Sequence, residues 1–124
     1  MKREQREHDR KVSEIKQILA DLNLPSLPLN TVYSAFFRTD IVTRIDTKFI
    51  PIDFINTRER IPIDIGGLCL IYNKDIVDFS LAVIADSLWQ ENLRDLRLAK
   101  LNLPPRLNLI PFREIREYFR KLSL

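Results

Sequence analysis

Ile50-Pro51-Ile52-Asp53 recurs eleven residues later as Ile61-Pro62-Ile63-Asp64. The polar stretch 56–59 separates the two copies, and apolar residues flank each of them. Because β-branched isoleucine favours a pleated surface that packs on one face, the repeat predicts two extended strands joined by a short turn. Proline cannot donate a hydrogen bond to a ladder, so each strand should have a side or an end that is unpaired.

Working outward from the repeat, we expect a β-hairpin over residues 41–72, with a bulge or a close backbone approach at Gly66-Gly67. The next segment, 76–85, is apolar on nearly every side, and Asp75 suits the positive end of a helix. This pattern predicts a long helix over residues 75–100, whose first half is buried in the core.

The two ends of the chain have helical periodicity. Residues 2–22 place Val12, Ile15 and Leu19 on one face, whereas residues 1–11 have no such face and are predicted to be a solvated helical extension. A short aromatic helix is expected over residues 31–38, and a last helix from Pro111 onward carries Phe112, Ile115, Phe119 and Leu122.

These elements predict the α+β class: a small antiparallel sheet packed against a long buried helix, with N- and C-terminal helices flanking it. The 124 residues are enough for one domain, 1–124, and 45% of them are hydrophobic and 30% charged. The apolar runs fall short of the roughly 20 residues that a membrane span needs, so we expect no membrane insertion. A single cysteine, Cys69, allows no internal disulfide and suggests the cytoplasm.

The chain lacks the residues that most kinds of catalytic site require. The only histidine, His8, lies in the predicted solvated extension and is interpreted as a surface residue, which disfavours a Ser-His-Asp triad or a multi-histidine metal site. Gly66-Gly67 matches neither the P-loop nor the dinucleotide fingerprint. We therefore expect no cofactor, and we favour a non-enzymatic role over an enzymatic one.

Carboxylate chemistry is what remains for an enzyme. Two or three acids that bind a divalent metal, with a nearby lysine, can activate water against a phosphodiester. Asp46 and Lys48 form an acid-x-lysine element on a predicted strand. The other candidate acids are Asp40, Asp53 and Asp64. A metal-dependent nuclease is thus the third hypothesis, and its motif is weak.

Positive charge gathers toward the C-terminus. The net charge is +3, yet residues 94–124 alone hold eight basic and three acidic residues. Arginines along a helix face can follow a phosphate backbone, although many such faces are only solvated. The candidate nucleic-acid-binding residues are Arg94, Arg97, Lys100, Arg106, Arg113, Arg116 and Arg120.

Association with protein is the leading hypothesis. The long charged helix, the strands with proline and the aromatic-rich segment offer more docking surface than a monomer of this size needs. The candidate interface residues are Val12, Ile15, Leu19, Tyr33, Phe36 and Phe37. We expect a non-enzymatic interaction or assembly module that forms a homo-oligomer or binds a protein partner, with nucleic-acid binding as the alternative.

Overall fold

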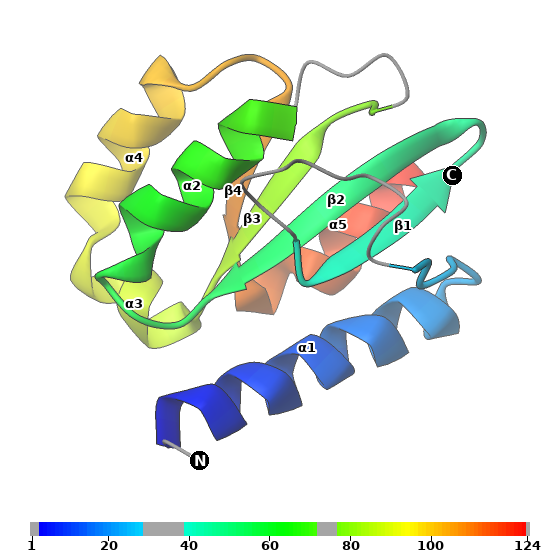
Figure 1. The fold of residues 1–124 in the computed structure, drawn as a ribbon, viewed down its shortest axis with the longest axis horizontal. Coiled ribbons are helices and arrows are strands. Elements are labelled where there is room, and N and C mark those ends of the chain that lie inside the picture. The colour runs from blue at the N-terminus through cyan, green and yellow to red at the C-terminus, as the bar shows by residue number, and fades with distance from the viewer. Residues whose placement is uncertain (1–2, 29–38, 72–76, 124) are drawn as a thin grey trace.

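The computed structural model describes residues 3–28, 39–71 and 77–123, which form a mixed sheet with helices on both faces (Figure 1). In chain order the elements are α1 (Arg3–Asp21), β1 (Ile41–Ile45), β2 (Lys48–Ile55), α2 (Arg60–Ile71), β3 (Ser80–Ile84), α3 (Asp86–Glu91), α4 (Leu93–Asn102), β4 (Leu107–Pro111), the 3-10 helix η1 (Phe112–Glu114) and α5 (Ile115–Leu122). The α+β class predicted from the sequence is confirmed.

The strands are ordered β1-β2-β3-β4 across the sheet. β1 and β2 form an antiparallel hairpin, in which Ile41 pairs with Ile52. β3 runs parallel to β2, and β4 runs parallel to β3. Parallel neighbours require a crossover connection, and α2 together with the α3-α4 pair supplies the two crossovers.

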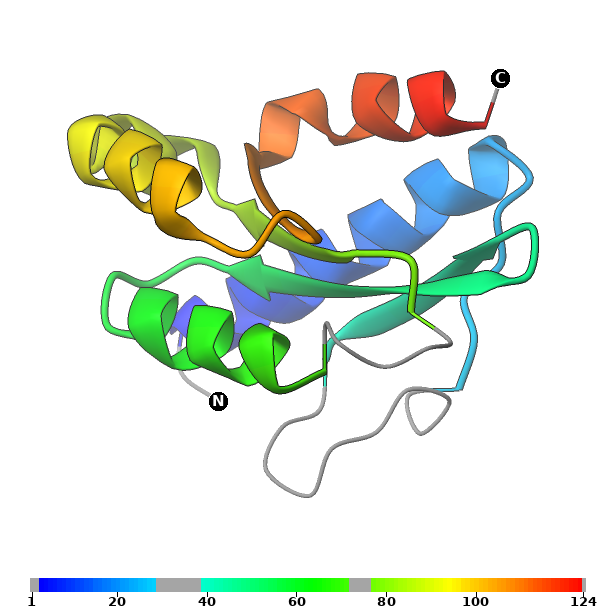
Figure 2. The ribbon, with the colours of Figure 1, turned by 90° about the horizontal axis from the view of Figure 1, so that it is seen from above.

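Two hydrophobic clusters cover the two faces of the sheet. Leu81 and Val83 of β3 point into a cluster with Ile15 of α1 and Phe119 of α5, whereas Ala82 and Ile84 point into a cluster with α2, α3 and α4. α1 and α5 run side by side in the same direction (Figure 2). All five residues of β3 are buried, as expected for a central strand that helices cover on both faces.

The first copy of the repeat forms β2, as predicted, whereas the second copy forms α2, so the strand predicted there is wrong. Pro62 lies in the first turn of α2, where a backbone N–H has no partner inside the helix, so proline costs nothing there. Pro51 lies in the part of β2 that precedes its pairing with β3, which begins at Ile52. The predicted hairpin therefore exists, but its second arm is β2.

The long helix predicted over 75–100 is also wrong. The apolar part of that segment forms β3, and only its later part is helical, as α3 and α4. The error has a physical reason: a strand that is buried on both faces has no alternation, so its apolar run resembles a buried helix. Residues 72–76, with the predicted cap Asp75, lie outside the described residues.

The terminal helices agree better with the sequence. α1 buries Ile15 and Leu19, and α5 buries Ile115 and Phe119, although Pro111 ends β4 instead of opening the helix. The aromatic segment 31–38 lies outside the described residues. No helix in the described ranges is both long enough and apolar enough to cross a membrane.

Candidate functional site

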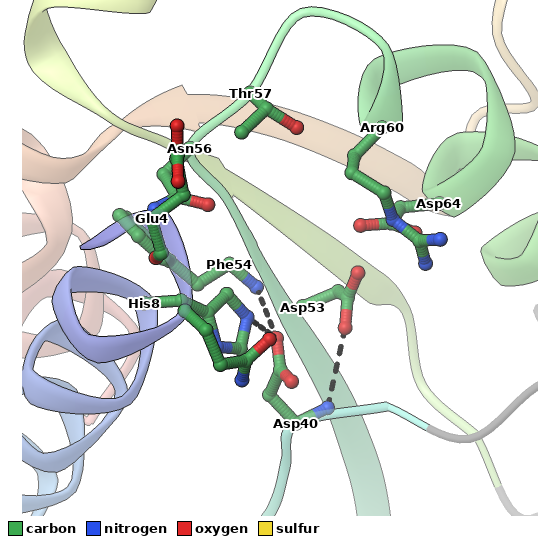
Figure 3. Close-up of a pocket in the computed structure, with 10 residues that line it drawn as sticks. Glu4, His8, Asp40, Asp53, Phe54, Asn56, Thr57, Arg60 and Asp64 are labelled. Carbon is green, nitrogen blue, oxygen red and sulfur yellow. Dashed lines mark hydrogen bonds and ion pairs between the residues drawn. The ribbon is translucent and has the colours of Figure 1, made fainter. Parts of the chain in front are cut away.

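A polar cavity of about 430 Å³ lies where four elements meet: the first turns of α1, the residue before β1, the end of β2 and the start of α2 (Figure 3). Its lining combines acids, cations and amides. The residues that line it are Glu4, Gln5, His8, Asp40, Asp53, Phe54, Asn56, Thr57, Arg60 and Asp64. Such a position, outside the C-terminal end of a parallel strand, is where α/β sheets commonly bind ligands.

The hairpin register brings Asp40 and Asp53 together. Ile41 pairs with Ile52, so the residues just outside this pair, Asp40 and Asp53, face each other at the end of the ladder. The backbone N–H of Asp40 donates to Oδ1 of Asp53 at 3.2 Å. The N–H of Phe54 donates to Oδ2 of Asp40 at 2.8 Å, so the hairpin backbone fixes both carboxylates.

His8 reaches Asp40 from α1. Its Nε2 lies 3.1 Å from Oδ2 of Asp40, and its ring packs against that of Phe54 with the centroids 5.8 Å apart. The hydrogen bond to Asp40 raises the pKa of His8 to about 9, against the opposing effect of burial. At neutral pH His8 is therefore a cation that neutralises Asp40. Nearby, Asn56 Nδ2 donates to the carbonyl of Glu4, which holds the first turn of α1 at the end of β2.

Asp64 has a cation of its own. On α2, Arg60 lies one turn before Asp64 and forms a hydrogen-bonded ion pair with it. The Asp64 side chain is buried, whereas that of Arg60 is half exposed. In Figure 3 this pair borders the side of the cavity across Asp53 from His8.

Asp53 lies between these two pairs and lacks such a partner. It is only 4% exposed, and it forms no ion pair with any residue that the structure describes. Burial, then repulsion from Asp40 and hydrogen bonding with it, raises the pKa of Asp53 to about 11. Burial opposes ionisation of Asp40 as well, but hydrogen bonds from His8, Asp53 and Phe54 outweigh it and lower the pKa of Asp40. Without another cation, Asp53 is protonated at neutral pH and Asp40 is ionised.

The structure separates the candidate acids into two groups. Asp40, Asp53 and Asp64 share the cavity, although they come from three different elements. Asp46 and Lys48 lie at the opposite end of the hairpin, where Asp46 has a φ of 56° in the turn. The acid-x-lysine element is therefore not part of this cavity.

The basic candidates do not form one surface. Arg94, Arg97 and Lys100 lie on α4, whereas the arginines of α5 lie on the other face of the sheet, where Arg116 pairs with Asp21 and Arg120 with Glu117. Arg113 approaches Asp86, and Arg106 donates to the carbonyls of Val77 and Asp78. Nucleic-acid binding by the whole set stays a prediction.

The interface candidates divide as well. Ile15 and Leu19 are fully buried between α1 and the sheet, so the chain's own core covers the stripe that we had assigned to a partner. Val12 is half-buried at the margin of the same cluster. Tyr33, Phe36 and Phe37 lie outside the described residues. An oligomeric state stays a prediction.

Sequence reasoning missed His8 and Arg60. His8 was interpreted as a surface residue, but it continues the buried stripe of α1, because residues 8, 12, 15 and 19 share one helix face. That spacing was the available signal. Arg60 had none, because the segment was predicted as a turn and a strand.

No known protein family, curated protein or solved structure matches this chain. In the described ranges, no three His, Cys, Asp or Glu side chains form a group that could hold a metal ion by themselves. A cation at this cavity would therefore need oxygen ligands from water or from a substrate, besides the protein.

Proposed function

We propose that the cavity binds Mg²⁺ or Mn²⁺ through Asp40 and Asp53 and hydrolyses a phosphodiester. The observation that carries the proposal is the charge pattern of the three acids. Asp40 has His8 and Asp64 has Arg60, while the buried Asp53 between them has no cation among the described residues. A divalent cation at Asp53 would replace its proton and offset the repulsion between the ionised Asp53 and Asp40.

Two carboxylates suit this ion. Mg²⁺ keeps several of its waters and is commonly held by one or two protein carboxylates together with substrate phosphates, so a cluster of three acids is not required. Asp40 and Asp53 are fixed by backbone N–H groups, which limits the cost of ordering them around an ion. A bound divalent ion would polarise a phosphoryl oxygen and lower the pKa of a water.

The rest of the lining suits a phosphate. Half-exposed Arg60 has guanidinium N–H groups besides the one that bonds Asp64, and these can bind a phosphate oxygen that the ion leaves free. Protonated His8, on the other side of the acids, keeps Asp40 ionised. Asn56 and Thr57 add uncharged hydrogen-bonding groups at the same cavity. The negative charge of a phosphodiester would be matched by the bound ion and by Arg60.

Isothermal titration calorimetry with MgCl₂ and MnCl₂ tests the ion site. We expect one site on the wild-type chain and loss of binding in Asp40→Asn and Asp53→Asn. Asp46→Asn is the matched control, since Asp46 is exposed in the hairpin turn and asparagine tolerates its positive φ. Absence of binding at millimolar metal would refute the proposal.

Hydrolysis of bis-p-nitrophenyl phosphate and of labelled single-stranded DNA tests the reaction. Activity should require Mn²⁺ or Mg²⁺, stop with EDTA, and be absent from Asp40→Asn while Asp46→Asn retains it. Metal binding without cleavage of either substrate would contradict the hydrolase while leaving the ion site intact. Cleavage that persists in EDTA would contradict both parts.

A further inference from the structure

The outward face of α4 combines large apolar side chains with cations. We define the α4 face as Arg94, Arg97, Leu98, Lys100 and Leu101. Leu98 is 52% exposed and Leu101 is 82% exposed, and they are among the few large apolar residues left in solvent in the described ranges. Two exposed leucines one helical turn apart lower the solubility of a protein, and such patches often mark interaction sites.

Helical geometry places these residues together. At 100° per residue, Arg94, Leu98 and Leu101 lie on the side of α4 opposite its buried residue, Leu96, and Arg97 and Lys100 lie along one flank of that side. Leu93, Arg94, Arg97 and Leu98 surround a shallow cavity of about 460 Å³. Asp95 is the acid nearest in sequence, and it lies on the other flank, so the α4 face carries positive charge only.

The three cations of this face have no charged partner among the described residues of the chain. All three are exposed, and none forms an ion pair or a side-chain hydrogen bond with a residue that the structure describes. The arginines of α5 differ, because Arg116 and Arg120 are paired with acids. The α4 face is thus available for an external negative charge.

Three other kinds of ligand for the α4 face would each leave either its cations or its leucines without a suitable contact. A second copy in a two-fold dimer would bring Arg94, Arg97 and Lys100 against their own images, which is repulsive. A nucleic-acid backbone would match the cations but would leave Leu98 and Leu101 without apolar contact. A membrane-surface helix separates its apolar and basic sides, whereas here arginines and leucines alternate along one arc.

We propose that the α4 face binds an acidic amphipathic segment of another protein, whose apolar residues cover Leu98 and Leu101 and whose carboxylates pair with Arg94, Arg97 and Lys100. Guanidinium groups form bidentate pairs with carboxylates, which fixes the orientation of such a segment. A helix that lays its apolar residues in a shallow groove is a common form of peptide recognition. This proposal is independent of the acidic cavity and of its chemistry.

The test is an NMR titration of the ¹⁵N-labelled chain with a synthetic helical peptide that carries leucines on one face and glutamates beside them. We expect shift changes confined to residues 93–102 and their neighbours. The same peptide with glutamine in place of glutamate should bind at least about tenfold more weakly. Shift changes located elsewhere, or none at all, would overturn the proposal.

Two double variants separate the contributions. L98S/L101S and R94Q/R97Q should each weaken peptide binding at least about tenfold. The matched control is R120Q/L122S on α5, which also removes one arginine and one exposed leucine and should bind normally. All substituted side chains are exposed, so folding should survive, and a circular-dichroism melt verifies it.

Two further ligands distinguish the sources of negative charge. Single-stranded DNA and phosphatidylserine vesicles should bind the α4 face more weakly than the peptide does. Equal binding of the peptide by wild type and L98S/L101S would overturn the proposal, as would DNA or vesicle binding that exceeds peptide binding and depends on Arg94 and Arg97.

Discussion

His8 of α1 and Asp40, the residue before β1, are joined by a hydrogen bond of 3.1 Å between Nε2 and Oδ2, although thirty-two positions separate them in the chain. Asp40 in turn accepts the N–H of Phe54 in β2. The pair therefore connects the first helix to the hairpin, and it does so at the edge of the acidic cavity.

This pair should make stability depend on pH. The pKa of His8 is raised from 6.5 to about 9, so the pair stabilises the fold fully below pH 6.5, and this contribution disappears as the pH rises through about 9. In His8→Gln, the free energy of unfolding should fall by about 1 kcal/mol at neutral pH, a value that allows for the partial exposure of the pair.

Urea unfolding of wild type and His8→Gln at pH values on both sides of that window tests this prediction. The difference between the two proteins should shrink in alkali. A difference that is constant over the whole range would mean that His8 stabilises α1 by packing against Phe54, and not by its charge.

Asp53→Asn should stabilise the chain. The folded state keeps a proton on Asp53 up to about pH 11, whereas the unfolded state loses it near the ordinary value of 3.8, so the wild-type chain loses stability as the pH rises between these values. Asparagine has no ionisable group and removes this loss. We expect a gain of roughly 1–3 kcal/mol at neutral pH and none near the ordinary pKa.

The measurement is chemical denaturation of both proteins at acidic and neutral pH, without divalent metal. A destabilised Asp53→Asn at neutral pH would show that the ionised carboxylate contributes to folding. The stabilised variant should at the same time lose the metal binding proposed above, because the uncharged amide replaces a carboxylate ligand. Such a trade is common, since a binding site often costs the free protein some stability.

Gly66→Ala should also stabilise the chain. Gly66 lies inside α2, has no positive φ, and an added Cβ would meet no atom within 4 Å. Alanine restricts the unfolded chain and favours the helix, which is worth about 0.5–1 kcal/mol. Thermal unfolding should show an increase of a few degrees. A lower melting temperature would contradict the assignment of 60–71 as a helix.

Ile15→Ala should destabilise the fold and leave the mass of the particle in solution unchanged. Ile15 is fully buried in the cluster that α1 shares with the sheet and α5, so truncation should cost about 2–5 kcal/mol. Ile15→Val, at about 0.5–1.5 kcal/mol, is the milder variant if the first does not fold. Light scattering that shows a smaller assembly without loss of stability would return Ile15 to an interface.

The sequence predicted best those helices that are buried on one side only. Ile15 and Leu19, like Ile115 and Phe119, occupy the buried side of helices that are exposed on the other, so their pattern identified both helices. β3 is buried on both faces, and no alternation distinguished it from a helix. For the cavity, the sequence supplied only a list of candidate acids. Three of them meet because strand pairing joins Asp40 to Asp53 and the crossover after β2 brings Asp64 beside them, and neither contact could be read from the sequence.

The repeated tetrapeptide shows that its surroundings determine its secondary structure. Ile-Pro-Ile-Asp is a strand at residues 50–53, between two other strands, and a helix start at residues 61–64. Isoleucine tolerates both structures, and proline is acceptable in the first turn of a helix. The turn before the second copy differs: the carbonyls of Thr57 and Arg58 accept from the N–H groups of Arg60 and Ile61, which starts the helical path of α2.

The ion pair between Asp21 and Arg116 joins α1 to α5 across ninety-five positions, and the buried faces of these helices share one cluster. During synthesis, α1 leaves the ribosome long before α5 exists. The apolar side of α1 is therefore partly exposed to solvent until α5 has been synthesised. The long separation predicts slow, cooperative closure of this face and a nascent chain that benefits from a chaperone.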